Sequence, residues 1–397
     1  MINKLTILSI VILFLIFQSL VEKSWSKPAD WYLLWSSFLI GFSVLFAYPD
    51  YDWKMVGLLW WLLSCGACAF GSRVGELISP PKVRIKLGAM NVLNYDSVLF
   101  LYFTFGTLYT ILLLRSNGFS ISSIKSVSDL YRINNYMQAY RYSKMDGSEG
   151  IIQQTCLSFT YALPICGGLI LVGKKNLKEI LKSFICLFPN FLISVINNTK
   201  SGIIIAVILF VSAYIVGYLM NNHTEPKLSP KLIKIMIVGV VLFLGFCFFV
   251  IRLRYNSDSS RRSSEYIIST IRDYIFGCTL NFDYYFSSIR HLDLSIPVDY
   301  FDGSNILTAN AFWIHRYGYC GTVILWWTRG FFSGMAYKNV KEGSFGIIEI
   351  LILLFVYLNA VYFFTYIPFS YTTVCIGVFF LFPVFFIIYR NQVFLRP

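Results

Sequence analysis

Long runs of apolar residues recur along the whole chain, and they constrain its fold more than any other feature. Each run is about 17–22 residues long, enough to cross about 30 Å of hydrocarbon at about 1.5 Å per residue of helix. Because backbone polar groups in lipid must be satisfied within the segment itself, such runs become helices. The alternating pattern of membrane-barrel strands is absent from the sequence. The sequence therefore predicts an all-α, polytopic integral membrane protein.

Composition agrees with this class, because 57% of the residues are hydrophobic and only 13% are charged. Soluble domains average about 45–50% apolar and about 25% charged residues. We predict about 11 transmembrane helices (10–12) in one transmembrane domain, residues 1–397. The predicted spans are approximately 5–21, 31–48, 55–71, 96–114, 151–173, 180–196, 202–219, 235–251, 319–336, 346–364 and 371–389.

Basic residues predict how these helices are oriented. Every second short loop is rich in Lys and Arg, whereas the short loops on the other side hold only Lys54 and Lys200. The positive-inside rule places the basic loops and the C-terminus in the cytoplasm, which puts the N-terminus outside if the chain has eleven spans. Two long loops, about 115–150 and 252–318, then face outward. Between Tyr266 and Cys278 the apolar spacing predicts an amphipathic helix, either in the headgroup plane or packed against the bundle.

Several kinds of chemistry have no motif in the sequence. It contains no phosphate-binding loop and no zinc spacing among its three histidines. The net charge of +13 is spread between apolar runs, where it sets topology and contacts lipid headgroups rather than nucleic acid. The Cys65-x-x-Cys68 pair lies inside a predicted span without further ligands, which favours helix packing over a metal. We predict neither a metal nor a cofactor.

What the sequence does offer is a set of outward-facing basic residues. Its members are Arg132, Arg141, Lys200, Arg252, Arg254, Arg261, Arg262, Arg272, Arg290 and Arg316. Arg binds phosphate oxygens bidentately and Lys binds them as a point charge, so the set suits a lipid-linked pyrophosphate at the membrane surface. Taken singly, each residue is also explained as a solvated surface charge. Tyrosines and phenylalanines are dense in both long loops, as in an interfacial aromatic belt or a surface that stacks on sugars.

Two further residues stand out by position. His315 directly precedes the ninth predicted span, where a histidine can act as a general base or can have a structural role. Arg329 lies about ten residues into that span. A charge at this depth implies a partner or a water-filled cavity, and the alternative is that it snorkels to the cytoplasmic headgroups.

Local motifs accompany this layout. The first motif opens a predicted span and is Asn-Thr-Lys-Ser-Gly, residues 198–202. The second leads into the ninth predicted span and is Tyr-Gly-Tyr-Cys-Gly-Thr-Val, residues 317–323. It is followed by Gly-Phe-Phe-Ser-Gly at 330–334. Together with the helix number and the two long loops, these motifs resemble the Wzy-type O-antigen (oligosaccharide repeat-unit) polymerase family. An Arg-x10-Gly spacing described in both long loops of some members occurs in neither loop here.

The resemblance implies glycosyl transfer at the periplasmic face of a bacterial inner membrane. The donor would be the growing chain on undecaprenyl pyrophosphate, and the acceptor a sugar hydroxyl on a new lipid-linked repeat unit. His315, Arg254 and Arg272 would be catalytic. His315 would take the acceptor proton, while Arg254, Arg272 and Lys200 would hold the pyrophosphate. The further substrate-binding residues would be Arg252, Arg316, Arg132 and Arg141.

Other functions stay open at this point. An O-antigen ligase uses the same chemistry with a different acceptor, and a lipid-linked oligosaccharide flippase or a scaffold subunit is a different class of protein. A transporter is expected to carry charges in several spans and to have short outer loops, whereas here the intramembrane charge is essentially Arg329 alone. Besides the lipid-linked substrate and membrane lipids, a chain-length regulator is a candidate partner.

Overall fold

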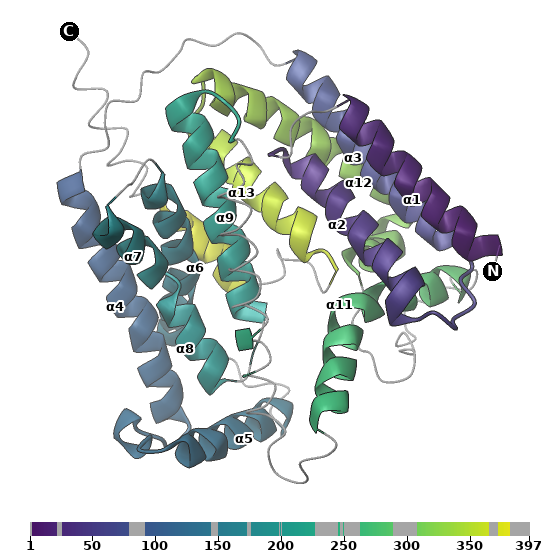
Figure 1. Cartoon of the computed structure of the whole chain (residues 1–397). Helices are drawn as coiled ribbons and strands as arrows, with labels where there is room; N and C mark the ends of the chain where they lie inside the picture. The colour runs from purple at the N-terminus through teal and green to yellow at the C-terminus, as the bar shows by residue number, and fades with distance from the viewer. Residues whose placement is uncertain are drawn as a thin grey trace, which may run out of the picture. The chain divides into compact units, whose positions relative to one another are not determined.

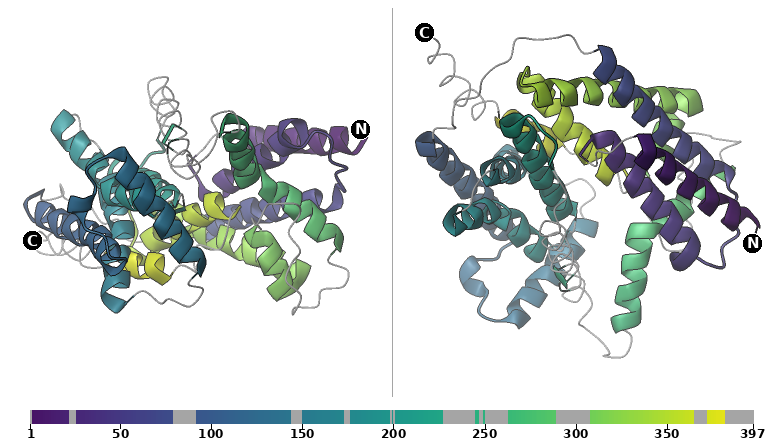
Figure 2. Two further views of the ribbon diagram at one scale, coloured as in Figure 1. Left: turned by 90° about the horizontal axis from the view of Figure 1, so that it is seen from below. Right: turned by 45° about the horizontal axis from the view of Figure 1, so that its top comes forward.

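The computed structural model describes residues 2–21, 26–78, 92–143, 150–172, 176–197, 199, 201–226, 245–246, 249, 263–288, 308–364 and 372–381. All regular elements in these ranges are helical (Figure 1 and Figure 2), which confirms the all-α prediction. The contacts divide the chain into two compact units, Met1–Ile85 with Ile268–Pro368 and Lys86–Ile267 with Phe369–Pro397. That these units form one transmembrane domain stays a prediction.

Within the described residues, six helical segments are long and apolar enough to cross a membrane. They are Pro28–Ala47, Val56–Ile78, Asp96–Ser116, Ile151–Leu171, Leu177–Ile196 and Ser201–Asn222. These segments match the second to seventh predicted spans, so the chain is a multi-pass membrane protein. The total of eleven stays a prediction. The predicted spans 5–21 and 346–364 correspond to shorter apolar helices, Asn3–Ile16 and Ile347–Tyr362, and 319–336 lies in the helix Ala309–Glu342, which is not among the six. Span 235–251 lies almost wholly outside the described residues, and 371–389 is described only to residue 381.

Unit 1 is built around the pair formed by α3 and α12 (Figure 1). Its helices are α1 (Ile2–Val21), α2 (Pro28–Phe42) with the π-helical turn η1 (Ser43–Ala47), α3 (Val56–Ile78), most of α11 (Ser263–Ser288), α12 (Ala309–Glu342) and α13 (Ile347–Tyr362). Helix α2 packs against α3 and α13, and α1 packs against α2. A core of large aromatic side chains fills the space between them.

Glycines bring the backbones of α3 and α12 together. A Cβ atom on Gly330 would lie 2.0 Å from the backbone oxygen of Cys68, and one on Gly334 would lie 1.9 Å from that of Ser72. Gly71 and Gly75 of α3 meet the backbone of α12 in the same way. Small residues four positions apart on both helices are the usual basis of close packing in membranes. This contact confirms the expected packing role of Cys68.

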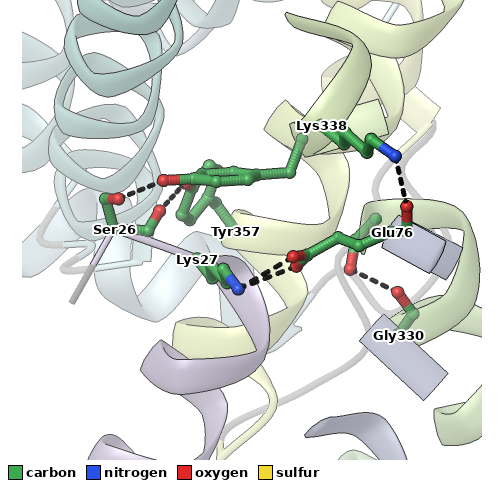
Figure 3. A network of polar contacts seen from close by, with 8 residues as sticks. Ser26, Lys27, Glu76, Gly330, Lys338 and Tyr357 are labelled. Carbon is green, nitrogen blue, oxygen red and sulfur yellow. Dashed lines mark hydrogen bonds and ion pairs between the residues drawn. The ribbon is translucent and has the colours of Figure 1, made fainter. Parts of the chain in front are cut away.

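Polar contacts tie one end of unit 1 together (Figure 3). The Nζ atom of Lys27, at the start of α2, lies 2.9 Å from Oε1 of Glu76, at the end of α3. Lys338 of α12 donates a hydrogen bond of 2.9 Å to the backbone oxygen of Glu76, and Tyr357 of α13 donates to the carbonyl of Ser26. Lys27, Glu76 and Lys338 fall at ends that the basic loops predict to be cytoplasmic, whereas Tyr357 lies well inside α13.

The opposite end of unit 1 is formed by the connection between η1 and α3, together with α11. Tyr48 donates a hydrogen bond of 2.8 Å to Asp273, and the backbone N–H of Lys54 donates one of 2.9 Å to Asp283. Residues predicted to face outward therefore share this end, as the alternation of the loops requires. Which end faces the cytoplasm stays a prediction.

The predicted amphipathic helix exists, and it is longer than its apolar pattern indicates. Helix α11 buries Phe276, Phe282 and Tyr285 against the rest of unit 1. The ring centroids of Phe276 and Phe42 are 4.5 Å apart, and those of Phe282 and Trp61 are 5.2 Å apart. Of the two alternatives for this helix, the structure therefore shows the one packed against the bundle.

Unit 2 surrounds α6 (Ile151–Leu171), which contacts α4, α7, α9 and α14 (Figure 1). Its other elements are α4 (Val92–Ser116), the 3-10 turn η2 (Ile121–Ser123), α5 (Val127–Ser143), α7 (Leu177–Ile185), α8 (Phe188–Ile196), α9 (Ser201–Asn222) and α14 (Thr372–Phe379). The predicted span 180–196 is two helices rather than one. Pro189 lies in the first turn of α8, where its missing N–H and fixed φ favour a helix start over a continuous helix.

Candidate functional site at the break in α12

Helix α12 is broken at Gly318 into two arms, residues 309–317 and 319–342. Gly318 has φ 72° and ψ 178°, a conformation that is essentially restricted to glycine. Asn310 of the first arm accepts a hydrogen bond of 2.8 Å from Nε1 of Trp326 in the second arm. In a continuous helix these residues would be about 24 Å apart, so the first arm must fold back along the second. The outer loop predicted at 252–318 therefore ends in a helical arm.

The start of the first arm lies deep inside unit 1. Thr308 caps it by accepting a hydrogen bond of 3.2 Å from the N–H of Ala311, and the N–H of Ala309 donates to the carbonyl of Phe363 at 2.7 Å. The side-chain amide of Asn310 donates to the hydroxyl of Tyr32 at 3.1 Å. The arm thus begins among α2 and α13 and runs outward to Gly318.

Arg329 lies on the second arm and faces the first. Its Cζ atom is 3.9 Å from the ring centroid of Trp313 and 5.2 Å from that of Trp326. Its Nη1 atom is buried. The two rings are themselves 5.2 Å apart, so the guanidinium lies beside both, over the ring of Trp313. It is held there by cation–π attraction, which is strongest away from water. Of the two alternatives for this residue, the structure therefore supports a buried charge with aromatic partners. That Arg329 lies within the membrane stays a prediction, because α12 is not among the six candidate spans.

His315 and Arg316 are in the last turn before the break. His315 is half-buried, whereas Arg316 is exposed, with its Cζ atom 5.9 Å from the ring of Tyr317. Beyond the break, the ring of Tyr319 lies 5.2 Å from Phe286 and 6.2 Å from Trp60. The break therefore presents an imidazole, a guanidinium and aromatic rings at the end of unit 1 that is predicted to face outward. Such groups can accept a proton, bind an anion and stack on a sugar ring.

Arg272 does not share this location. It is on α11, where its Nε atom lies 2.9 Å from Oδ1 of Asp273 and its Cζ atom lies 5.1 Å from the ring of Tyr48. The hydrogen bond with Asp273 raises the pKa of Arg272. The end of α11 near the break is marked by Phe286, fourteen residues later, which corresponds to about 21 Å of helix. The structure thus brings His315 and Arg316 together and leaves Arg272 apart from them.

The remaining predicted site residues belong to unit 2. Arg132 of α5 is exposed and lies 3.8 Å from Asp129. Asn134, two residues later, donates a hydrogen bond of 2.7 Å to the carbonyl of Val195 at the end of α8. Helix α5 is therefore anchored at the end of α8, just before the junction that leads into α9. Lys200, Arg252, Arg254 and the side chain of Arg141 lie outside the described residues.

Sequence reasoning missed Asn310, Trp313 and Trp326, because the segment before Gly318 was assigned to a loop. A signal was present in the sequence: Thr308 is a good N-cap residue, and Gly318 is a good stop ten residues later. No pattern near Trp326 or Arg329 in the sequence indicates that these residues contact the first arm. Asp283 was also missed as a buried carboxyl, because it follows the predicted end of the amphipathic pattern.

Among the described residues, no group of three or more His, Cys, Asp or Glu side chains is arranged to hold a metal ion. No protein-family model matches the chain, and no curated protein or solved structure is significantly similar to it.

Proposed function

We propose that this chain is a membrane glycosyltransferase that joins undecaprenyl-pyrophosphate-linked repeat units of an O-antigen or surface polysaccharide at the periplasmic face. The observation that carries the proposal is the placement of His315, Arg316 and two tyrosines at the break in α12. Here an imidazole that can accept a proton, an exposed cation and aromatic rings lie together at the end of unit 1 that is predicted to face outward.

In the proposed reaction, His315 accepts the proton of the acceptor hydroxyl as its oxygen bonds to the anomeric carbon of the donor sugar. The bond from that carbon to the pyrophosphate oxygen breaks, and undecaprenyl pyrophosphate leaves with the electron pair. Arg316 is the nearby cation that can stabilise this charge. Lys200, Arg254 and Arg252 keep their proposed roles in holding pyrophosphate, as does Arg141 in binding substrate. For Arg272 and Arg132, exposure supports contact with substrate or headgroups rather than with the reacting carbon.

A second candidate, a lipid-linked oligosaccharide flippase or other transporter, is favoured by one specific observation. Broken membrane helices and buried charges are typical of transporters, and α12 combines a break at Gly318 with the buried guanidinium of Arg329. A ligase that transfers the polymer to lipid A–core would use the same groups as a polymerase.

The test is a gel of surface lipopolysaccharide from a strain that lacks the gene, complemented with the wild-type chain or with His315→Gln. For a polymerase we expect a single repeat unit on the core in the deletion strain, a restored ladder with the wild type, and no ladder with His315→Gln. Arg115→Met, which removes an exposed arginine at the end of α4, is the matched control and should restore the ladder.

Three other results would point elsewhere. Core without any repeat unit would contradict polymerisation and indicate the ligase or the flippase. An unchanged ladder in the deletion strain would place the chain outside this pathway. A full ladder with His315→Gln would remove His315 from the reaction.

A further inference from the structure

We propose that Arg329 is a positioning residue that latches the 309–317 arm of α12 against the 319–342 arm and thereby sets the position of His315 and Arg316. Trp313 is the residue of the first arm that the guanidinium contacts, with Cζ 3.9 Å from the ring centroid. The roles of His315 and Arg316 in this inference rest on the proposed function, whereas the latch itself does not.

Gly318 has no side chain with which to hold the two arms together. A Cβ atom built on Gly318 would meet no atom within 4 Å, and the residue has the positive φ that only glycine adopts readily. The hinge therefore permits the reversal without enforcing it. The start of the first arm is bonded to Phe363 and Tyr32. The contacts between the two arms converge on Asn310, Trp313, Trp326 and Arg329, and Trp313 and Arg329 are those nearest to His315.

Trp326 forms a fixed wall for the latch. Its ring stacks on Tyr32 at a centroid distance of 3.7 Å, and its N–H is bonded to Asn310. Trp313, which is 3% exposed, contacts both Trp326, at a centroid distance of 5.2 Å, and the guanidinium. Arg329 thus contacts both Trp326, which is packed in the core of unit 1, and Trp313, which lies on the first arm two residues before His315.

The charge, and not only the volume, carries this contact. A cation over an aromatic face in a medium of low polarity is attracted more strongly than in water, and a planar guanidinium can stack where an ammonium cannot. Methionine at position 329 would fill much of the same space without the charge. Lysine would keep the charge but lose the stacking.

The experiment measures exposure of position 315 in the full chain, in intact cells, with a membrane-impermeant maleimide. The probe is His315→Cys in a Cys320→Ser background, since Cys320 is the exposed cysteine among those described. Cys320→Ser alone gives the background signal. Position 315 is half-buried, so we expect slow labelling with Arg329 and about tenfold faster labelling with Arg329→Met as the arm opens more often. Arg329→Lys should give a smaller increase, and Arg115→Met none.

A double-mutant cycle separates a latch from general destabilisation. Trp313→Leu removes the other half of the contact, so it should raise the labelling rate on its own. Combined with Arg329→Met it should add little, because the two changes remove the same interaction. An unchanged rate in Arg329→Met, or a fully additive double variant, would overturn the latch. If Arg329→Met does not accumulate in the membrane, Arg329→Lys and Trp313→Leu supply the same comparison.

The polysaccharide ladder, measured with His315 intact, separates the latch from the proposed function. Faster labelling and a lost ladder in Arg329→Met support both. Faster labelling with a normal ladder would support the latch and show that the reaction does not need His315 to be held in this position. A lost ladder with unchanged labelling overturns the latch and leaves the proposed function intact.

Discussion

The indole N–H of Trp326 donates a hydrogen bond of 2.8 Å to Asn310, sixteen residues earlier in the same helix. The amide of Asn310 in turn donates to the hydroxyl of Tyr32 at 3.1 Å. All three side chains are fully buried. One amide therefore links both arms of α12 to α2, and it does so where water cannot replace a lost partner.

Replacing Asn310 with alanine should destabilise the protein by about 1–3 kcal/mol, because the buried N–H of Trp326 loses its acceptor. The measurement is the thermal unfolding midpoint of the purified protein in detergent. Asn222→Ala is the matched control, since Asn222 is exposed and its side chain bonds only within α9 in the contact to Tyr218. Equal shifts for the two variants would mean that the bond to Trp326 contributes nothing.

Replacing Gly334 with alanine should force α3 and α12 apart, because the new Cβ atom would lie 1.9 Å from the backbone oxygen of Ser72. We expect a loss of roughly 1–3 kcal/mol or more, as for overpacked cores. Gly41→Ala in α2 is the control, since its Cβ atom would meet no atom within 4 Å. That change should be neutral or stabilising, because alanine is the better helix former. A neutral Gly334→Ala would show that the helices can separate at little cost.

Changing Glu76 to glutamine should destabilise unit 1 by roughly 3 kcal/mol, because it removes the carboxylate that faces the mostly buried Lys27. The control is Asp52→Asn, which breaks the ion pair with Lys54. The side chain of Lys54 is 52% exposed and that of Asp52 is 84% exposed, so we expect the free energy of unfolding to change by about 0–1 kcal/mol. Unfolding midpoints of both variants, measured at low and high salt, check the prediction. A Glu76→Gln effect as small as that of Asp52→Asn would contradict it.

Asp283 predicts a pH dependence of stability. Burial raises the pKa of this carboxyl from 3.8 to about 6. Between those values the folded state holds a proton that the unfolded state has released, so stability falls as the pH rises and is lowest above the folded pKa. Asp283→Asn removes the buried charge and keeps an acceptor for Lys54. It should therefore be more stable than the wild type at neutral pH by on the order of 1–2 kcal/mol and similar to it near pH 4.

The measurement is the unfolding midpoint from about pH 4 to pH 8, the range in which the carboxyl of Asp283 loses its proton, since its pKa is about 6. Asp52→Asn removes an exposed carboxylate that makes a minor contribution to the raised pKa of Asp283, so its stability should still fall with rising pH, with the fall moved slightly towards lower pH. A parallel profile for Asp283→Asn and the wild type would show that Asp283 does not titrate in this range.

Features of the fold that depend on residues close to one another in the sequence could be predicted from the sequence. The six confirmed spans follow from apolar runs, and α11 follows from the spacing between Tyr266 and Cys278. The break between α7 and α8 was missed, although Pro189 marked it, because hydropathy averages over such a position. For the candidate site, the sequence identified His315, Arg316 and Arg329 but not how they are related.

The sequence by itself determined that this chain is helical and crosses a membrane several times, because length and hydropathy decide whether a segment can leave water. Only the tertiary structure decided that α12 folds back on itself and that Arg329 lies beside Trp313 and Trp326. The physical reason is that a glycine such as Gly318 permits many backbone conformations and therefore many angles between the two arms, without strongly favouring one of them. The direction taken depends on contacts between residues 310 and 329, whose partners are chosen by packing against α2, α3 and α13.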